Sequence, residues 1–154
     1  MNKLPLRPNV CLLIMNREGR LFLGERLGEP GVWQLPQGGV EAGSSEAENA
    51  LREASEELGA APALLQVVAK LRATHSYDWT KIPAYAADKW RGQQQSFYLL
   101  SFSGTDTDLK LDRFEPEFSS FRWCTAAEVR QLAEPKRSLG YLAALEEFEN
   151  LIKR

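Results

Sequence analysis

The sequence predicts a single α/β domain in which helices pack on a mixed β-sheet. Its 154 residues suit one domain with one core, so we take residues 1–154 as that domain. A hydrophobic share of 44% and a charged share of 26% are typical of a globular protein. Short apolar runs with strand character alternate with segments of helical spacing, and the chain has no repeat or linker. These three observations together predict the α/β class.

The N-terminal part is expected to contain a hairpin and a loop. Residues 10–15 (VCLLIM) form a continuous apolar run, which is typical of a strand buried on both faces. Residues 16–19 resemble a turn, and the apolar residues 21–23 complete the hairpin. Residues 28–43 are rich in glycine and proline, so they predict a structured loop without regular elements.

A helix follows, and its signals are the clearest in the chain. Ser44 and Ser45 supply N-cap side chains, and apolar residues then recur at helical spacing as far as Leu58. Gly59 supplies the C-terminal stop.

The rest of the chain predicts further strands, two helices and their connections. Thr125 caps the first of these helices, and the second is amphipathic. In chain order we expect a strand at 64–74, a loop at 77–94, a strand at 96–102, a polar connection at 104–112, a strand at 118–124, a helix from Thr125 toward Ala133 and a helix at 139–152.

Neither a signal peptide nor a membrane span is apparent, because no apolar run is long enough for either. We therefore expect a cytoplasmic protein that begins at or near Met1 and does not act at a membrane. Cys11 and Cys124 lie among apolar residues, which indicates reduced, buried thiols.

The charge balance restricts the kind of ligand. A formal net charge of −2 argues against bulk binding of nucleic acid, which needs clustered lysine and arginine. A polyphosphate substrate would therefore be held locally, by metal ions and a few placed arginines. The chain has a single histidine and no Cys/His metal spacing, so oxygen atoms must hold any metal. Oxygen ligands favour Mg²⁺ or Mn²⁺ over Zn²⁺.

Three carboxylates carry the strongest chemical signal. Glu53, Glu56 and Glu57 are three and four residues apart, so a helix places them on one face. They also lie in the last turn, where the helix dipole disfavours negative charge, and a divalent cation would compensate both effects. A solvated acidic helix face is the alternative. Gly38 and Gly39 favour the metal site, because glycine allows backbone groups to approach the acids closely.

Residues 38–60 (GGVEAGSSEAENALREASEELGA) resemble the Nudix box of the Nudix hydrolase superfamily. That box is a glycine, five residues, a glutamate, seven residues, Arg-Glu, a hydrophobic residue, any residue, Glu-Glu, any residue and a glycine. The matching positions here are Arg52, Glu53, Glu56, Glu57 and Gly59. The resemblance implies a mixed β-sheet sandwiched between α-helices and a hydrolase of phosphorus-containing anhydrides.

Two positions depart from the box. The first glutamate of the family falls on Ser44, and the hydrophobic position is Ala54. In the family that glutamate braces the arginine that matches Arg52, so its loss should weaken the loop more than the chemistry. Neither departure removes a metal ligand, and we expect activity to survive.

Segments outside the box resemble the branch of bacterial RNA pyrophosphohydrolases and dinucleoside polyphosphate (Ap4A) hydrolases. These segments are RPNV at 7–10, WQLPQGG at 33–39, WRGQQQSFYLL at 90–100, PEF at 116–118 and FRW at 121–123. The resemblance implies that Glu117 is a fourth metal ligand and that the carbonyl of Gly38 completes a coordination shell. It also implies substrate-binding roles for Arg7, Arg26, Gln37 and Gln95.

Several residues keep two interpretations at this stage. Glu117 is otherwise an ordinary exposed acid, and Arg7 and Arg26 either grip phosphates as guanidinium forks or keep the surface soluble. The aromatic residues of the 77–90 loop either stack on a base or pack the loop down. His75 has a structural role or assists proton transfer. Ser96 stands where the branch often has lysine, and the 77–90 loop also differs from the pattern of the branch. Both differences leave the exact substrate undecided.

The expected mechanism is in-line attack on phosphorus by a water that two or three Mg²⁺ or Mn²⁺ ions activate. Glu53 or Glu56 is the expected proton acceptor, with Glu57 as the alternative, and Arg52 braces the loop. The expected substrate is 5′-triphosphorylated RNA or a dinucleoside polyphosphate. The alternatives are a housecleaning enzyme for (d)NTPs or nucleotide sugars and a non-catalytic nucleotide-binding module. The oligomeric state and any activating protein are not predicted.

Overall fold

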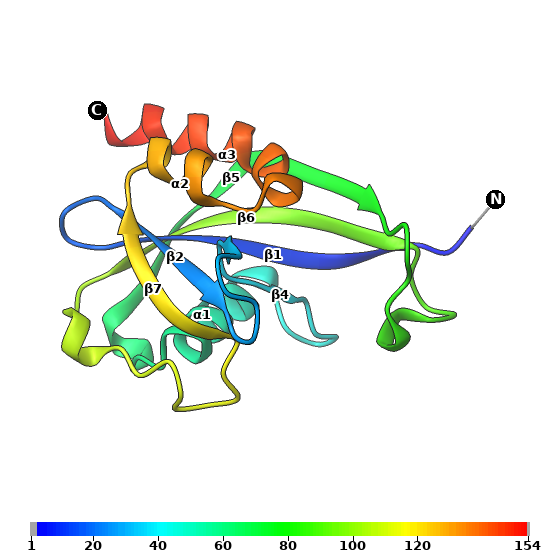
Figure 1. Ribbon diagram of the computed structural model, residues 1–154, viewed down its shortest axis with the longest axis horizontal. Coiled ribbons are helices and arrows are strands. Elements are labelled where there is room, and N and C mark those ends of the chain that lie inside the picture. Colours follow the sequence, from blue (N-terminus) through cyan, green and yellow to red (C-terminus); the bar gives the residue numbers. More distant parts are fainter. Residues whose placement is uncertain (1–2, 154) are drawn as a thin grey trace.

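A computed structural model describes residues 3–153 (Figure 1). Residues 1, 2 and 154 lie outside the described part, so the extent of the 1–154 domain at both ends stays a prediction. The α-helices and strands are β1 (Leu6–Met15), β2 (Leu21–Arg26), β3 (Trp33–Gln34), β4 (Gln37–Gly39), α1 (Glu46–Leu58), β5 (Leu65–Asp78), β6 (Gly92–Phe102), β7 (Phe118–Cys124), α2 (Ala126–Leu132) and α3 (Pro135–Ile152). Short 3₁₀ turns occupy Pro62–Leu64, Ala84–Ala86 and Asp106–Asp108.

The strands form one mixed sheet, as predicted. Its order is β3-β2-β1-β6-β5, with β4 paired to β1 and β7 paired to β2. The central strands β1 and β6 run parallel, and the other pairs are antiparallel. Helix α1 covers one face, and α2 and α3 cover the other (Figure 1).

Strand β1 separates two hydrophobic cores. Successive side chains of a strand point to opposite faces, so the buried run from Asn9 to Ile14 supplies both cores at once. Leu13 packs with Tyr141 and Phe148 of α3 on one side. Leu12 packs on the other side with residues of α1. The prediction of a first strand buried on both faces is confirmed.

Helix α1 begins and ends where the sequence predicts. The Ser45 hydroxyl accepts the backbone N–H of Glu48 at 3.0 Å, and the Glu48 carboxylate accepts the N–H of Ser45 at 3.1 Å. This reciprocal pair satisfies two amide groups that the first turn leaves free. At the other end Gly59 adopts φ 62° and donates its N–H to the carbonyl of Glu56. The carboxylates of the last turns are therefore fixed on a well-terminated helix.

The glycine-rich region is more regular than expected. We predicted a loop without regular elements at 28–43, whereas the structure contains β3 and β4 there. Strand β4 forms because its backbone pairs with β1, in the register Val10 to Gly38 and Cys11 to Gln37. Such a tertiary contact leaves no hydrophobic pattern in the local sequence, since glycine has no side chain to pack.

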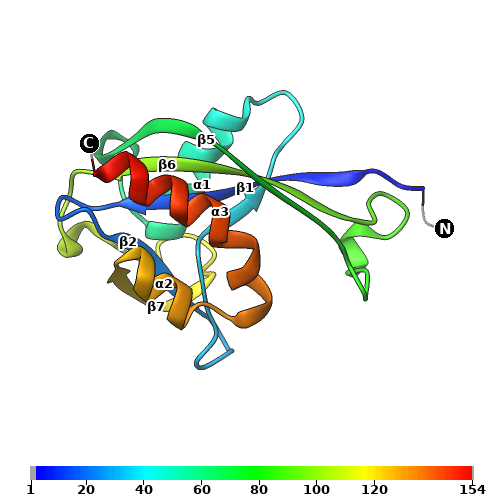
Figure 2. The same ribbon diagram turned by 90° about the horizontal axis from the view of Figure 1, so that it is seen from above.

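Other boundaries were also wrong, and β1 begins at Leu6, four residues before the predicted strand. Strand β5 continues to Asp78 and β6 begins at Gly92, so the predicted 77–94 loop shrinks to 79–91. Both extensions are polar and pair with each other, and they project beyond the helices together with the start of β1 (Figure 2). Helix α3 begins at Pro135, four residues before the predicted start. Proline at the first helical position is a favourable start, because its missing N–H is not needed there.

The cysteine prediction is confirmed, because Cys11 and Cys124 are both free and buried. Burial raises the pKa of the Cys11 thiol to about 12. Among residues 3–153, no helix has the length and apolar character that crossing a membrane requires.

Candidate active site

The acidic face of α1 is partly sunk into the protein. Glu57 is 8% exposed, and its Oε2 atom is buried without a hydrogen-bond partner. The side chain of Glu53 is 15% exposed, whereas that of Glu56 is 43% exposed. A buried carboxylate oxygen without a partner costs free energy unless a cation or a proton satisfies it. The face is therefore not the solvated acidic surface of the alternative interpretation.

Burial and neighbouring negative charges raise the pKa of both inner carboxylates. The pKa of Glu57 rises to about 9, chiefly through burial and then through the charges of Glu117, Glu53 and Glu56. The pKa of Glu53 rises to about 7, again chiefly through burial. The negative charge of Glu56 raises it further, and the positive charge of Arg52 lowers it. Without a bound cation, Glu57 therefore holds a proton at neutral pH.

Glu117 joins this group from a distant part of the chain. Its charge raises the pKa of both Glu53 and Glu57, so it faces the acidic side of α1. The residue stands immediately before β7, and its carbonyl accepts the N–H of Leu27 at 2.9 Å. Arg26 lies in the same place, because it pairs with Phe118 and its charge lowers the pKa of Glu57.

Gly38 brings the β4 backbone against the carboxylates. A Cβ atom on Gly38 would collide with the carboxyl group of Glu53, and one on Gly39 would collide with the guanidinium of Arg7. Neighbouring residues of a strand point to opposite sides, so the glycine pair touches both groups at once. The sequence-based expectation that glycine permits this close approach agrees with the geometry.

Arg52 lies across the outer edge of the acidic face. Its guanidinium donates to the Glu41 carboxylate at 3.0 Å and to the Asn49 side-chain oxygen at 2.6 Å. Its nitrogens also approach carboxylate oxygens of Glu53 at 3.6 Å and Glu56 at 4.0 Å. Arg52 thus joins the loop before α1 to two of the acids.

The two arginines expected to bind substrate are engaged with the protein. Arg7 lies against the rings of Tyr85 and Trp90, at 5.0 and 5.5 Å from their centroids. Arg26 pairs with Glu29 at 2.9 Å and donates to Gln34 at 3.0 Å. Arg26 lies near Glu57, whereas Arg7 lies against Gly39, on the side of β4 opposite Glu53.

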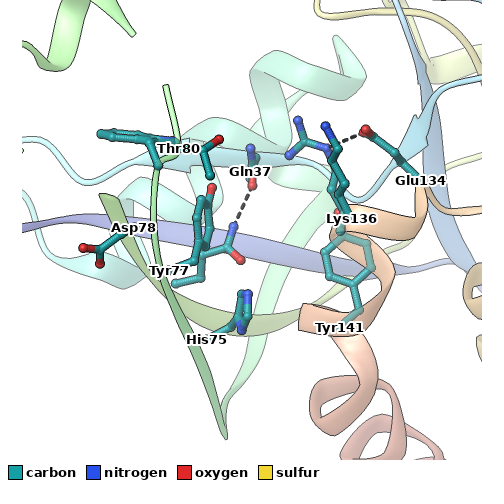
Figure 3. Close-up of a pocket in the computed structure, with 11 residues that line it drawn as sticks. Gln37, His75, Tyr77, Asp78, Thr80, Glu134, Lys136 and Tyr141 are labelled. Atoms are coloured by element: carbon teal, nitrogen blue, oxygen red, sulfur yellow. Dashed lines mark hydrogen bonds and ion pairs between the residues drawn. The ribbon is translucent and has the colours of Figure 1, made fainter. Parts of the chain in front are cut away.

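A pocket of about 350 Å³ lies between β4, the end of β5 and the start of α3 (Figure 3). Gln37 and Gln95 both line it, and the Gln95 amide donates to the Gln37 side-chain oxygen at 2.7 Å. The structure therefore brings these two predicted residues together. Gln37 immediately precedes Gly38 in the chain. The other lining residues are His75, Tyr77, Asp78, Trp79, Thr80, Glu134, Lys136, Arg137 and Tyr141.

Sequence reasoning missed part of this pocket. Lys136 and Arg137 reach it because α3 starts early at Pro135, and the pattern for a 139–152 helix did not include them. Asn9 and Gln93 were also missed, although they bond to each other at 3.0 Å in the buried polar layer behind Gln95. Polar residues inside otherwise buried strands were the available signal.

Comparison with known proteins identifies this arrangement. A NUDIX domain model matches residues 5–145, which include α1, β4 and Glu117. The chain belongs to the Nudix hydrolase family. An RNA pyrophosphohydrolase of Novosphingobium aromaticivorans is 40% identical over 97% of this chain and 96% of its own length. One of Roseobacter denitrificans is 39% identical over 96% of this chain and 94% of its own length.

Solved structures support the Nudix fold. A binary complex of a C. elegans Ap4A hydrolase superposes with a TM-score of 0.68 at 18% identity, covering 96% of this chain and 98% of that one. A Nudix hydrolase structure from Listeria monocytogenes has a TM-score of 0.68 at 22% identity, covering 97% and 94%. At these identities the likeness concerns the fold alone.

Replacing Gly38 with alanine is expected to lower turnover about 10-fold, because the new methyl group must displace the Glu53 carboxyl group. Steady-state kinetics and a melting curve of the same preparation would measure the effect. Gly28→Ala is the control for the replacement of a glycine itself. A Cβ atom at Gly28 meets nothing within 4 Å, so this variant reports only the strain that a φ of 79° imposes on alanine. Wild-type turnover in a folded Gly38→Ala protein would contradict the close approach.

Proposed function

We propose that this chain is a pyrophosphohydrolase that cleaves a pyrophosphate linkage in a nucleotide 5′-polyphosphate, with 5′-triphosphorylated RNA or a dinucleoside polyphosphate as substrate. The observation that carries the chemistry is the buried Glu57 carboxylate, whose pKa the charges of Glu117 and Glu53 raise. Glu53 in turn lies against Gly38. The relatives named RNA pyrophosphohydrolase, similar over almost the whole chain, support the substrate. A nucleotide substrate also suits an acidic chain with a few placed arginines.

Nudix hydrolases generally depend on a divalent metal, and the donors here fit Mg²⁺ or Mn²⁺. Glu53, Glu56, Glu57 and Glu117 offer carboxylate oxygens, and the Gly38 carbonyl offers a further one, which is the donor chemistry that hard cations prefer. Within residues 3–153, no three acidic, histidine or cysteine side chains are close enough to hold an ion as they stand. We infer that these carboxylates move closer together when they bind a cation.

The bound ions would activate the attacking water and offset the charge that gathers on the phosphate oxygens. In the proposed reaction, Glu53 or Glu56 accepts the proton of the attacking water as the water oxygen bonds to phosphorus. The anhydride P–O bond breaks, and its electrons leave with the departing phosphate. Glu57 is the alternative acceptor. Arg52 holds the loop and the carboxylates in place, and it does not contact the substrate.

Substrate recognition is assigned to four side chains: Arg26 beside the acids, and Arg7, Gln37 and Gln95 around β4. Arg7 and Arg26 bind phosphate oxygens, since a guanidinium forms two parallel hydrogen bonds to them. Gln37 and Gln95 present their amides in the pocket beside β4 and contact the nucleotide. A cytoplasmic location accords with such substrates and stays a prediction.

A substrate panel tests the proposal. Purified protein in Mg²⁺ would be assayed on 5′-triphosphorylated RNA, Ap4A, dNTPs and ADP-ribose by product release. We expect kcat/KM for one of the first two to exceed that for any dNTP or ADP-ribose by at least about 10-fold, a difference of about 1.4 kcal/mol. Preference for dNTPs or ADP-ribose would instead support a housecleaning enzyme. Binding without turnover of any member would support a non-catalytic module.

A further inference from the structure

A buried asparagine ties the loop before α1 to the acidic face. Asn49 is fully buried within α1, on the side of the helix that packs against the protein. Asparagine is a poor helix former, and a buried amide costs free energy unless its groups are bonded. Its presence there is explained by the contacts that it makes.

Three contacts fix the orientation of the Asn49 amide. Its oxygen accepts the backbone N–H of Glu41 at 3.1 Å and the guanidinium of Arg52 at 2.6 Å. Its nitrogen donates to the carbonyl of Ser45, the N-cap residue, at 2.7 Å. Both partners of the oxygen are donors and the partner of the nitrogen is an acceptor, so the reversed amide would lose all three bonds.

Glu41 completes the arrangement from the surface. Its side chain is 66% exposed, and its carboxylate bonds to Arg52 at 3.0 Å. Solvent screens an ion pair this exposed, so the buried Asn49 oxygen is the stronger restraint on the guanidinium. Arg52 is therefore held from the loop side, with Glu53 and Glu56 on its other side.

We propose that Asn49 is a positioning residue that, together with Glu41, replaces the carboxylate absent at Ser44 and orients Arg52 against Glu53 and Glu56. The position of Ser44 is the one at which the Nudix box has its arginine-bracing glutamate. In this chain the brace comes from three residues earlier in the loop and from within the helix. The expected effect on turnover rests on the proposed hydrolase function. The expected effect on metal affinity does not depend on that function.

The test compares Asn49→Leu, a variant of similar volume without polar atoms, with Asn49→Leu/Ser44→Glu. Partners that orient metal ligands typically contribute 10- to 100-fold to metal affinity or activity. We expect Asn49→Leu to weaken Mn²⁺ binding, measured by electron paramagnetic resonance of the free ion, by about 10-fold. We expect kcat to fall by about the same factor with KM within about 3-fold. Adding Ser44→Glu should recover at least about 3-fold of each loss.

Ser55→Ala is the matched control. Ser55 is a buried polar residue of the same helix, and its hydroxyl donates to the carbonyl of Ala60, beyond the end of the helix, at 2.7 Å. We expect it to lower the melting temperature without changing Mn²⁺ affinity. Equal Mn²⁺ affinity in wild type and folded Asn49→Leu would overturn the positioning role. Failure of Ser44→Glu to recover any affinity would overturn the replacement of the missing carboxylate.

If Asn49→Leu does not fold, a variant of the exposed residue Glu41 tests the inference instead. Glu41→Ala removes a surface carboxylate and is compared with Glu18→Ala, another exposed acid in the turn between β1 and β2. We expect Glu41→Ala to weaken Mn²⁺ binding about 3-fold and Ser44→Glu to reverse this, while equal affinity in both variants overturns the inference. If the wild type binds Mn²⁺ but hydrolyses none of the substrates, the proposed function fails and the affinity comparison still decides the role of Asn49.

Discussion

Glu53→Gln and Glu56→Gln are each expected to lower kcat by about 10²-fold or more, with the fold intact. Each change keeps the side-chain shape and removes one negative charge and one proton acceptor, and groups of this kind contribute at least that much to hydrolysis. Steady-state kinetics at saturating Mg²⁺, on the best substrate of the panel, would measure it. Turnover within about 3-fold of wild type in both variants would remove these carboxylates from the mechanism.

The melting temperature shows whether a variant loses activity through its chemistry or through a damaged fold. The pKa of Glu53 is raised to about 7, so above that pH its charge destabilises the metal-free fold. Glu53→Gln should therefore raise the melting temperature of the metal-free protein at pH 8 while it lowers activity. Glu18→Gln, remote from the acids, should change neither quantity. A lower melting temperature for Glu53→Gln at pH 8 would contradict the raised pKa.

Removing the metal with EDTA is expected to abolish activity, and Mg²⁺ or Mn²⁺ should restore it. The affinity for the ion should rise with pH between about 6 and 9, because Glu53 and Glu57 have pKa values raised to about 7 and about 9 and must release protons to bind a cation. For each proton released, the gain approaches 10-fold per pH unit. Calorimetric titration of Mn²⁺ at pH 6, 7.5 and 9 would measure the slope.

The same two groups set how the stability of the metal-free protein depends on pH. Both pKa values are higher in the folded state than the usual 4.5, so the folded state binds more protons than the unfolded one between about pH 4.5 and 9. Their contribution is therefore lost as the pH rises through that window, and added Mg²⁺ should recover it. Glu57→Gln should reduce both the pH slope of Mn²⁺ affinity and the loss of stability near pH 9. An affinity independent of pH would contradict protonated carboxylates.

The sequence predicted those parts of the fold that depend on local contacts. The ends of α1 follow from Ser45 and Gly59, and β7 occupies the predicted residues 118–124, because capping and apolar runs are properties of neighbouring residues. Strands β3 and β4 were missed because they exist only through pairing with other strands. The polar ends of β5 and β6 were missed for the same reason.

The residues of the site that share one helix face were predicted from the sequence, whereas those that tertiary contacts bring together were not. Helical spacing alone placed Glu53, Glu56 and Glu57 together, and family resemblance added Glu117, whose charge reaches them. The brace at Asn49 could not be anticipated, since a polar residue within a helix pattern does not reveal that it faces inward toward a loop. The entry of Lys136 into the pocket depended on where α3 begins. The roles of all these residues in catalysis and binding stay predictions.

The parallel pairing of β1 with β6 also governs how the chain can acquire its shape. Val10 pairs with Ser96, and the register runs from Leu6 with Gly92 to Met15 with Ser101. The two strands are far apart in the sequence, so β1 is synthesised well before its parallel neighbour β6. Until β6 is made, β1 is an apolar strand with an open edge, which invites association between nascent chains. Truncation before Phe102 should therefore yield insoluble fragments.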